Sequence, residues 1–234
     1  MNKYLILFVL LIIQGCSSGG GDSSPATAIP LETSVIRAYQ EGDTVTATLT
    51  YTDPTTGNTV SGDATLVVGG IVQNPFGVDC RTYSMSGTLT GPEGTVAYSV
   101  RELYYQDTNN SIYECGEFND ILGRYVFLTD TAMSPNGIIL STKSPVQLGD
   151  TTSGIVFYDD GTWEDCTKTV QSKENVSVPL GLYESYKAYI SCSHSDGSTS
   201  VVTQWSVPSI YTMKETGVID GLNAEFVLNS YSYK

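Results

Sequence analysis

The chain has 234 residues, and its 11 lysines and arginines stand against 25 aspartates and glutamates, which gives a formal net charge of −14 at pH 7. Nucleic acid and bare anionic lipid surfaces are bound through positive patches, so the composition makes both poor partners, and we expect no nucleic-acid partner. Charged residues make up only 15% of the chain and hydrophobic ones 40%, a balance typical of a folded domain rather than a solvated tail.

The N-terminus has the features of a secretion signal. Lys3 supplies a positive charge, and an unbroken apolar run follows over residues 4–13. Crossing a bilayer takes about 20 apolar residues, so this run is too short to span one. Small polar residues, rather than basic stop-transfer residues, come next. We therefore expect residues 1–15 to be removed as a signal peptide.

The predicted cleavage site reads Ile13-Gln14-Gly15-Cys16. It resembles the lipobox of bacterial lipoproteins, in which an aliphatic residue, a tolerant position and a small residue precede a cysteine. The resemblance implies a covalent diacylglycerol on the thiol of Cys16 and an N-acyl chain on its new amine, and we expect no other cofactor. Several acyl chains anchor a protein firmly to a membrane. An ordinary signal peptide with an incidental cysteine is the alternative.

A stretch without apolar side chains follows the lipobox. Residues 17–25 are serine, glycine and aspartate with a final proline, which predicts a flexible tether with a reach of about 20–25 Å. Ser17 in place of aspartate implies sorting to the outer membrane if the cell is Gram-negative. We predict a signal at 1–15, a lipidated cysteine and tether at 16–33, and a globular domain at 34–234, in the cell envelope.

Alternation of apolar and polar residues recurs through the globular domain. The clearest runs are 44–51, 96–100 and 224–228, and no helical stripe exceeds two turns. Turn-forming residues separate such runs at 53–58, 91–94, 107–110, 135–137, 159–161 and 195–197. The pattern predicts an all-β fold, an antiparallel sandwich or barrel-like sheet system. Tyrosine-rich segments between paired cysteines leave open a division into two similar halves.

Besides Cys16, the chain has four cysteines, Cys80, Cys115, Cys166 and Cys192. An even number in an exported protein suits two disulfides. If residues 179–181 turn the chain between two strands, Cys166 and Cys192 face each other, which leaves Cys80 for Cys115. A metal site is the weaker alternative, because the chain has no C-x-x-C motif and only one histidine.

Catalytic groups are hard to find in the sequence. The one histidine, His194, stands in a predicted turn, where its close neighbours cannot build a relay of nucleophile, base and orienting acid. The acidic segment 159–165 lacks the spacing of a calcium-binding loop, so we interpret it as a hairpin turn with a strand starting at Trp163, and calcium remains the alternative. We predict no catalytic residue and no metal ligand, and an enzyme is disfavoured.

Tyrosine is abundant, with 16 residues, and it clusters at Tyr104-Tyr105, at 183–189 and at 231–233. Adjacent strand residues point to opposite faces, so some rings should be exposed and able to contact a glycan or protein ligand. The alternative is that tyrosine simply suits half-buried sheets.

Three segments of the C-terminal half, 143–150, 176–183 and 205–210, resemble segments of uncharacterised bacterial lipoproteins. The resemblance implies an antiparallel β-rich fold and no known activity. We therefore expect a membrane-anchored envelope protein that acts as a binding or structural module. A carrier of a lipid or other apolar ligand in a sheet cavity is the first alternative, and a hydrolase of envelope glycans is the second. A large apolar cavity would favour the carrier; carboxylates of perturbed pKa converging in a cleft would favour the enzyme.

Overall fold

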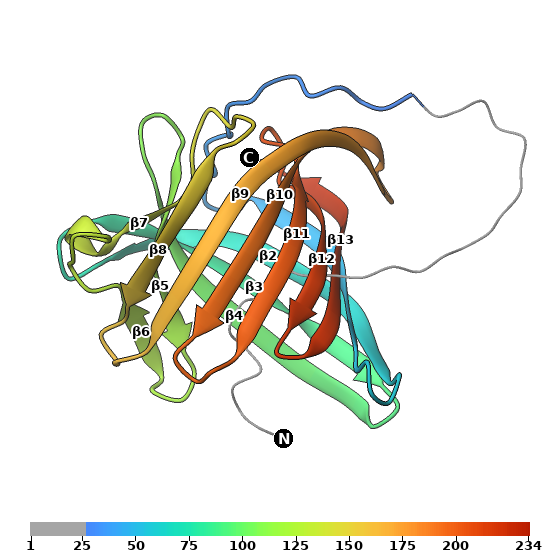
Figure 1. The fold of residues 1–234 in the computed structure, drawn as a ribbon, viewed down its shortest axis with the longest axis horizontal. Helices are drawn as coiled ribbons and strands as arrows, with labels where there is room; N and C mark the ends of the chain where they lie inside the picture. Colours follow the sequence, from blue (N-terminus) through green and yellow to red (C-terminus); the bar gives the residue numbers. More distant parts are fainter. Residues whose placement is uncertain (1–26) are drawn as a thin grey trace, which may run out of the picture.

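The computed structural model describes residues 27–234, so the predicted signal peptide and Cys16 lie outside the described residues. Figure 1 shows that strands dominate the fold. The elements are β1 (Thr44–Thr52), β2 (Thr59–Gln73), β3 (Asp79–Gly91), β4 (Gly94–Gln106), β5 (Ile112–Asn119), β6 (Arg124–Phe127), a 3₁₀ turn η1 (Pro135–Gly137), β7 (Ile139–Thr142), β8 (Thr151–Phe157), β9 (Trp163–Val178), β10 (Gly181–His194), β11 (Thr199–Ser206), β12 (Thr212–Ile219) and β13 (Leu222–Ser232).

All the strands belong to one 13-stranded antiparallel sheet in the order β6-β5-β4-β3-β2-β1-β13-β12-β11-β10-β9-β8, with β7 paired to β5. Neighbours in the sheet are therefore neighbours in the sequence, except where the first strand pairs with the last and where β7 pairs with β5. This pairing joins two meanders and leaves the edges of the sheet in the middle of the chain. The predicted all-β antiparallel class is confirmed, as a single continuous sheet that curves strongly but does not close.

The curvature brings two layers face to face. In Figure 1, β8 to β13 form the near layer, and β2 to β5 run behind it in a different direction. Register shifts in the β2–β3, β9–β10 and β11–β12 ladders place bulges in β2, β9 and β12, which increase local twist and bend the strands. The side chains on the inner faces of both layers therefore share one interior.

The two edges of the sheet meet along a seam, the boundary between β7 and β8. At one end the edges are joined by backbone hydrogen bonds from Thr129 N–H to the Phe157 carbonyl (2.8 Å) and from Asp159 N–H to the Phe127 carbonyl (3.0 Å). Within the described chain no ladder pairs β7 with β8, and the Thr152 hydroxyl donates across to the Ser141 carbonyl at 3.2 Å. The seam is the least hydrogen-bonded boundary between adjacent strands.

The apolar core fills one side of the interior. Leu49, Met213, Phe226 and Leu228 are fully buried there, on β1, β12 and β13. The predicted alternation holds along 45–49 and 224–228, where Val45, Ala47, Leu49, Ala224, Phe226 and Leu228 are all buried. It fails at Val96, which is 55% exposed near the end of the β3–β4 hairpin, where the opposite layer provides no cover.

The six predicted turn segments all lie between strands. The first is typical, because the side chain of Asp53 accepts hydrogen bonds from the backbone N–H groups of Thr55 and Thr56. No helix in residues 27–234 is long and apolar enough to cross a membrane.

Candidate functional site: an interior cavity lined by tyrosines and carboxyls

Two adjoining cavities of about 140 Å³ each lie inside the curved sheet under the seam, and core residues such as Tyr83 and Val202 form part of their walls. We name them the tyrosine cavity and the carboxyl cavity after their linings. Tyr104, Ser141, Lys168 and Gln204 line both, so the two are neighbours through a shared wall.

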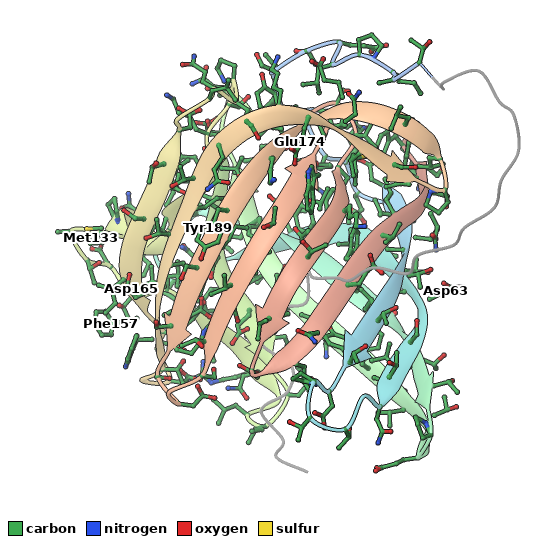
Figure 2. The ribbon with its side chains drawn as sticks, turned by 45° about the vertical axis from the view of Figure 1, so that its right-hand side comes forward. Asp63, Met133, Phe157, Asp165, Glu174 and Tyr189 are labelled. Atoms are coloured by element: carbon green, nitrogen blue, oxygen red, sulfur yellow. A yellow bond between two sulfur atoms is a disulfide. The ribbon has the colours of Figure 1, made fainter. Side chains whose placement is uncertain are left out.

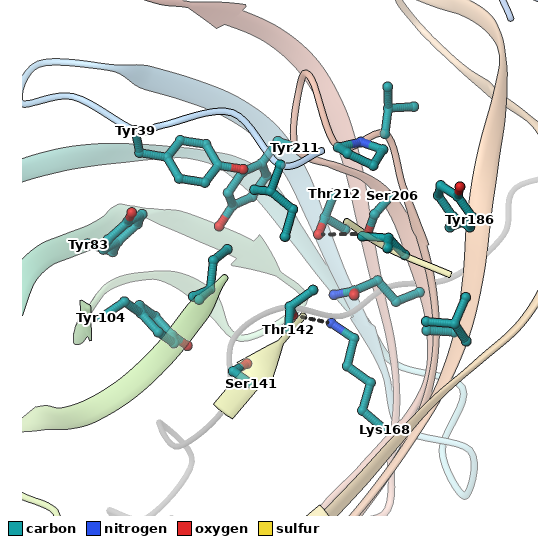
Figure 3. A pocket seen from close by; sticks show the side chains of 18 residues that line it. Tyr39, Tyr83, Tyr104, Ser141, Thr142, Lys168, Tyr186, Ser206, Tyr211 and Thr212 are labelled. Atoms are coloured by element: carbon teal, nitrogen blue, oxygen red, sulfur yellow. Dashed lines mark hydrogen bonds between the residues drawn. The ribbon is translucent and has the colours of Figure 1, made fainter. Parts of the chain in front are cut away.

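The tyrosine cavity collects rings from distant parts of the sequence. Tyr39, Tyr83, Tyr104, Tyr186 and Tyr211 line it, and Figure 3 shows the first three across the cavity from Tyr186 and Lys168. Tyr83 and Tyr104 meet edge to face with ring centres 5.3 Å apart, and Tyr39 meets Tyr83 and Tyr211 in the same way at 6.0 Å. Such contacts fix the rings as a rigid, largely apolar wall.

The carboxyl cavity is lined by glutamates that the strand alternation turns inward. They come from β4, β5, β9 and β12, and Glu117 lies beside them in a small adjoining space. We call the set the interior carboxyls: Glu102, Glu114, Glu117, Glu164 and Glu215. Lys168 is the one lysine that lines the carboxyl cavity.

Hydrogen bonds satisfy only part of the interior carboxyls. The Tyr104 hydroxyl donates to Glu102 Oε2 at 3.1 Å, and the Tyr158 hydroxyl donates to Glu114 Oε1 at 2.7 Å. The Gln204 amide donates to Oε1 of Glu215, but Oε2 of the same carboxyl has no hydrogen-bond partner among the described residues. An unsatisfied buried carboxyl oxygen is costly, and Glu215 is one of the residues that line the cavity.

Burial raises the pKa of each interior carboxyl. It raises the pKa of Glu102 to about 7 and that of Glu117 to about 9, and repulsion from Glu114 adds to both shifts. The pKa of Glu215, which is 0% exposed, is also raised by burial. In a poorly solvated space the ionisation of one carboxyl disfavours the ionisation of its neighbours.

Lys168 is shifted in the opposite direction. Burial lowers its pKa to about 8, and the nearby carboxyl of Glu215 partly offsets that effect. Its ammonium donates to the Thr142 hydroxyl at 3.0 Å, which ties β9 to β7 across the seam (Figure 3).

The structure contains two disulfides, which join the cysteine pairs that the sequence favoured. Cys166 and Cys192 lie opposite each other in the β9–β10 ladder, as expected from a turn at 179–181, and they line the carboxyl cavity. Cys80 and Cys115 bridge β3 and β5 in a separate cluster with Leu103.

His194 differs from its expected place. It is the last residue of β10 rather than a simple turn residue, and it is only 7% exposed. Its Nδ1 lies 3.8 Å from Glu164 Oε1, and Ser200 lies on its other side. Burial lowers the pKa of its imidazole, so the ring is neutral at pH 7.

The acidic segment 159–165 forms the predicted hairpin turn, and β9 begins at Trp163. Within residues 27–234, no three His, Cys, Asp or Glu side chains are grouped to hold a metal ion. The sequence pattern did not indicate that Glu164, which belongs to this segment, points toward the interior.

Most clustered tyrosines face the interior rather than solvent. Tyr189 and Tyr231 are exceptions, with 40% and 38% exposure, and Figure 2 shows Tyr189 on the outer side of the sheet with Asp165.

The interior carboxyls had a signal in the sequence, because Glu102 occupies the same strand face as Val100 and Tyr104. An ionisable residue at an inward position marks a departure from the apolar pattern.

Comparison with known proteins gives no function. No protein-family model and no curated protein matches the chain. Two solved structures are similar to it at 12% identity: a candidate lipoprotein from Parabacteroides distasonis, which matches 86% of this chain and 98% of its own with a TM-score of 0.41, and a candidate exported protein with a YmcC-like fold from Bacteroides fragilis, which matches 85% and 99% with a TM-score of 0.43. At this level of similarity neither structure identifies a site in the chain.

Proposed function

We propose that the chain is a binding protein of the cell envelope, anchored through lipid on Cys16, that takes a small ligand into the interior of its curved sheet. The observation that supports this proposal is the pair of adjoining cavities inside the sheet. Concave, mostly apolar pockets with a few polar groups are typical of small-molecule sites.

The cavity volumes limit the size of the ligand. An apolar protein cavity of about 150 Å³ holds one benzene molecule. Each cavity here, at about 140 Å³, therefore suits a group of about one ring. A ligand that occupies both would be a ring with a short polar arm, and a lipid with two long acyl chains exceeds the space.

The seam offers an entry route. Ser141 and Thr142 of β7 line the tyrosine cavity, and Thr152 and Gly154 of β8 line the carboxyl cavity. Strands without a shared ladder separate at lower cost than hydrogen-bonded ones, because fewer backbone bonds must break. A ligand entering between β7 and β8 would reach both cavities directly.

Hydrolysis of an envelope glycan is supported less well. Carboxyls of raised pKa do converge, as a general acid requires. However, they line interior spaces of one-ring size, whereas a polysaccharide needs an open cleft that accepts several sugars. Binding of a small molecule therefore fits the geometry better than cleavage of a polymer.

The cavity proposal is tested with small phenyl-substituted compounds, neutral and charged, titrated against the protein by calorimetry. We expect saturable binding of at least one compound at one site per chain. Ala188→Phe fills the tyrosine cavity and should abolish binding, with Ser206→Phe as a second filler if the first fails to fold. Ser193→Phe, at an exposed position on the same strand β10 as Ala188, is the matched control. Binding that survives a folded filler variant would overturn the proposal.

The anchor is tested separately in cells. Radioactive fatty acid should label the wild-type protein and leave Cys16→Ala unlabelled, because the acyl chains attach at that cysteine. Equal labelling of the two proteins would remove the anchor from the proposal without affecting the cavity.

A further inference from the structure

We propose that the ligand is an organic amine whose ammonium group binds in the carboxyl cavity, opposite Glu215 and Glu102, with its apolar body in the tyrosine cavity. The inference rests on the proposed binding function and names the chemical class of the ligand. Glu215 and Glu102 are the residues that would contact the ammonium group, and Tyr104 lies at the junction of the two cavities.

The free oxygen of Glu215 is the first support. Its Oε2 is fully buried and lacks a hydrogen-bond partner among the described residues, while Oε1 accepts from Gln204. The missing partner must be a donor once the carboxyl is ionised, because a carboxylate only accepts hydrogen bonds. An ammonium group supplies three donors and the compensating charge.

The charge balance of the cavity is the second support. Five interior carboxyls lie near one lysine. The titratable and polar groups around Glu102 and Glu215 are Tyr51 on β1, Tyr104 on β4, Glu114 and Glu117 on β5, Glu164 and Lys168 on β9, Gln204 on β11, and Tyr211, which precedes β12. Burial and repulsion between the carboxyls raise the pKa of Glu102 and Glu215. A cation that enters beside them favours their ionised forms, because its charge compensates the charge of the carboxylate. Binding of the amine should therefore release protons.

The neighbouring rings are the third support. Tyr104 lines both cavities and donates its hydroxyl to Glu102, so its ring lies beside the carboxyl that would hold the cation. Tyrosine rings attract cations through their faces and also suit an apolar body. A ligand with a ring and a short aminoalkyl arm would place its ring in the tyrosine cavity and its ammonium group in the carboxyl cavity.

An anionic ligand would have to approach Lys168. That lysine already lies in the field of Glu215 and donates to Thr142. Every other ionisable side chain that lines the carboxyl cavity is an acid, so a carboxylate ligand would be repelled once any of them ionised.

The experiment compares three ligands that share one body: 4-phenylbutylamine, 4-phenylbutanol and 4-phenylbutanoate. Calorimetry at neutral pH should show the amine binding at least about tenfold more tightly than the alcohol. The observed heat should differ between phosphate and Tris buffers by the ionisation heat of the released protons. Glu215→Gln should bring the amine to within about twofold of the alcohol and leave the affinity for the alcohol unchanged.

Matched variants keep the test decisive. Glu102→Gln serves as the second variant if Glu215→Gln fails to fold. Glu225→Gln is the control, because Glu225 lies on the adjacent strand β13, where it pairs with Lys214 outside the cavities. It should leave the preference for the amine intact.

Each contrary outcome has a distinct meaning. Equal affinity for amine and alcohol would overturn the inference and leave the proposed binding function standing. Preference for the carboxylate, abolished by Lys168→Met, would overturn it in favour of an anion. Failure of all three compounds to bind would overturn both proposals.

Discussion

The interior of the curved sheet has two sides. On both, alternate residues of the strands point inward, but the inward side chains are apolar on one side and acidic on the other. On one side, β1, β12 and β13 direct Leu49, Met213 and Phe226 inward and pack them without solvent contact. On the other side, β4 and β9 direct Glu102 and Glu164 inward, onto a cavity. The first side stabilises the fold, and the second side leaves polar groups incompletely satisfied. Departures of this kind are expected where a protein binds a ligand rather than where it is most stable.

The largest expected difference between the two sides is in stability. Phe226→Ala should lower the free energy of unfolding by about 3–5 kcal/mol, because it removes a fully buried ring and leaves a void. Glu215→Gln, equally buried, should change it by less than about 1 kcal/mol, because the amide keeps the shape and an acceptor for Gln204. Urea unfolding followed by circular dichroism measures both. Equal losses would contradict the division of the interior into two sides.

The Cys166–Cys192 disulfide sharpens the comparison, because it lines the carboxyl cavity where apolar packing is sparse. Replacing both cysteines by alanine should lower the free energy of unfolding by about 2–4 kcal/mol, since the unfolded chain gains freedom. The matched control is the replacement of both Cys80 and Cys115 by alanine. The disulfide between them closes a loop of similar length, with a sequence separation of 35 residues against 26 for Cys166–Cys192. Urea unfolding should give similar losses for the pairs, but only the first should also weaken ligand binding.

Local patterns in the sequence predicted the apolar side well. The alternation at 224–228 identified an inward face, and the turn at 159–161 placed the start of β9 at Trp163. Both depend on residues adjacent in the chain, so their physical causes can be read from a short window. The cysteine pairing in β9 and β10 also followed from one hairpin.

The carboxyl side could not be predicted in the same way. The cavity is assembled from β4, β5 and the strands β7 to β12, and its position depends on the pairing of β1 with β13 at opposite ends of the chain. The register of the glutamates relative to distant strands cannot be read from a short window of sequence. Even so, Glu102 lies between the inward residues Val100 and Tyr104, so an acid on an apolar strand face was a usable signal.

The pH dependence of stability should come from the carboxyl side. The unfolded chain releases the proton of Glu102 near the ordinary pKa of 4.5, whereas the folded protein holds it to a pKa of about 7. The folded state thus binds the extra proton between these values, so this contribution is complete below pH 4.5 and is lost as the pH rises through 7. We expect the urea concentration at the midpoint of unfolding to decrease as the pH is raised from 5 to 8.

Two variants test whether the interior carboxyls cause this pH dependence of stability. Glu102→Gln should flatten the fall, because it removes one of the raised groups. Asp165→Asn, an outward-facing neighbour of Glu164 on β9, should leave the slope unchanged. A slope that both variants share with the wild type would mean that the interior carboxyls do not control the pH response.

The smallest expected effect comes from charges on the outer face. Arg124 and Asp159 form an ion pair at 2.9 Å, but their side chains are 47% and 36% exposed. Water and salt screen such a pair, so Arg124→Ala should change the free energy of unfolding by at most about 0.5–1 kcal/mol. Urea unfolding at low and high salt measures the change, and a larger loss would mean that this pair helps to hold the edges of the sheet together next to the seam. A small loss would mean that an ionised carboxylate on the outer face contributes little to the free energy of unfolding, because water solvates it there. The interior carboxyls lack that solvation, so their ionisation should affect stability more strongly.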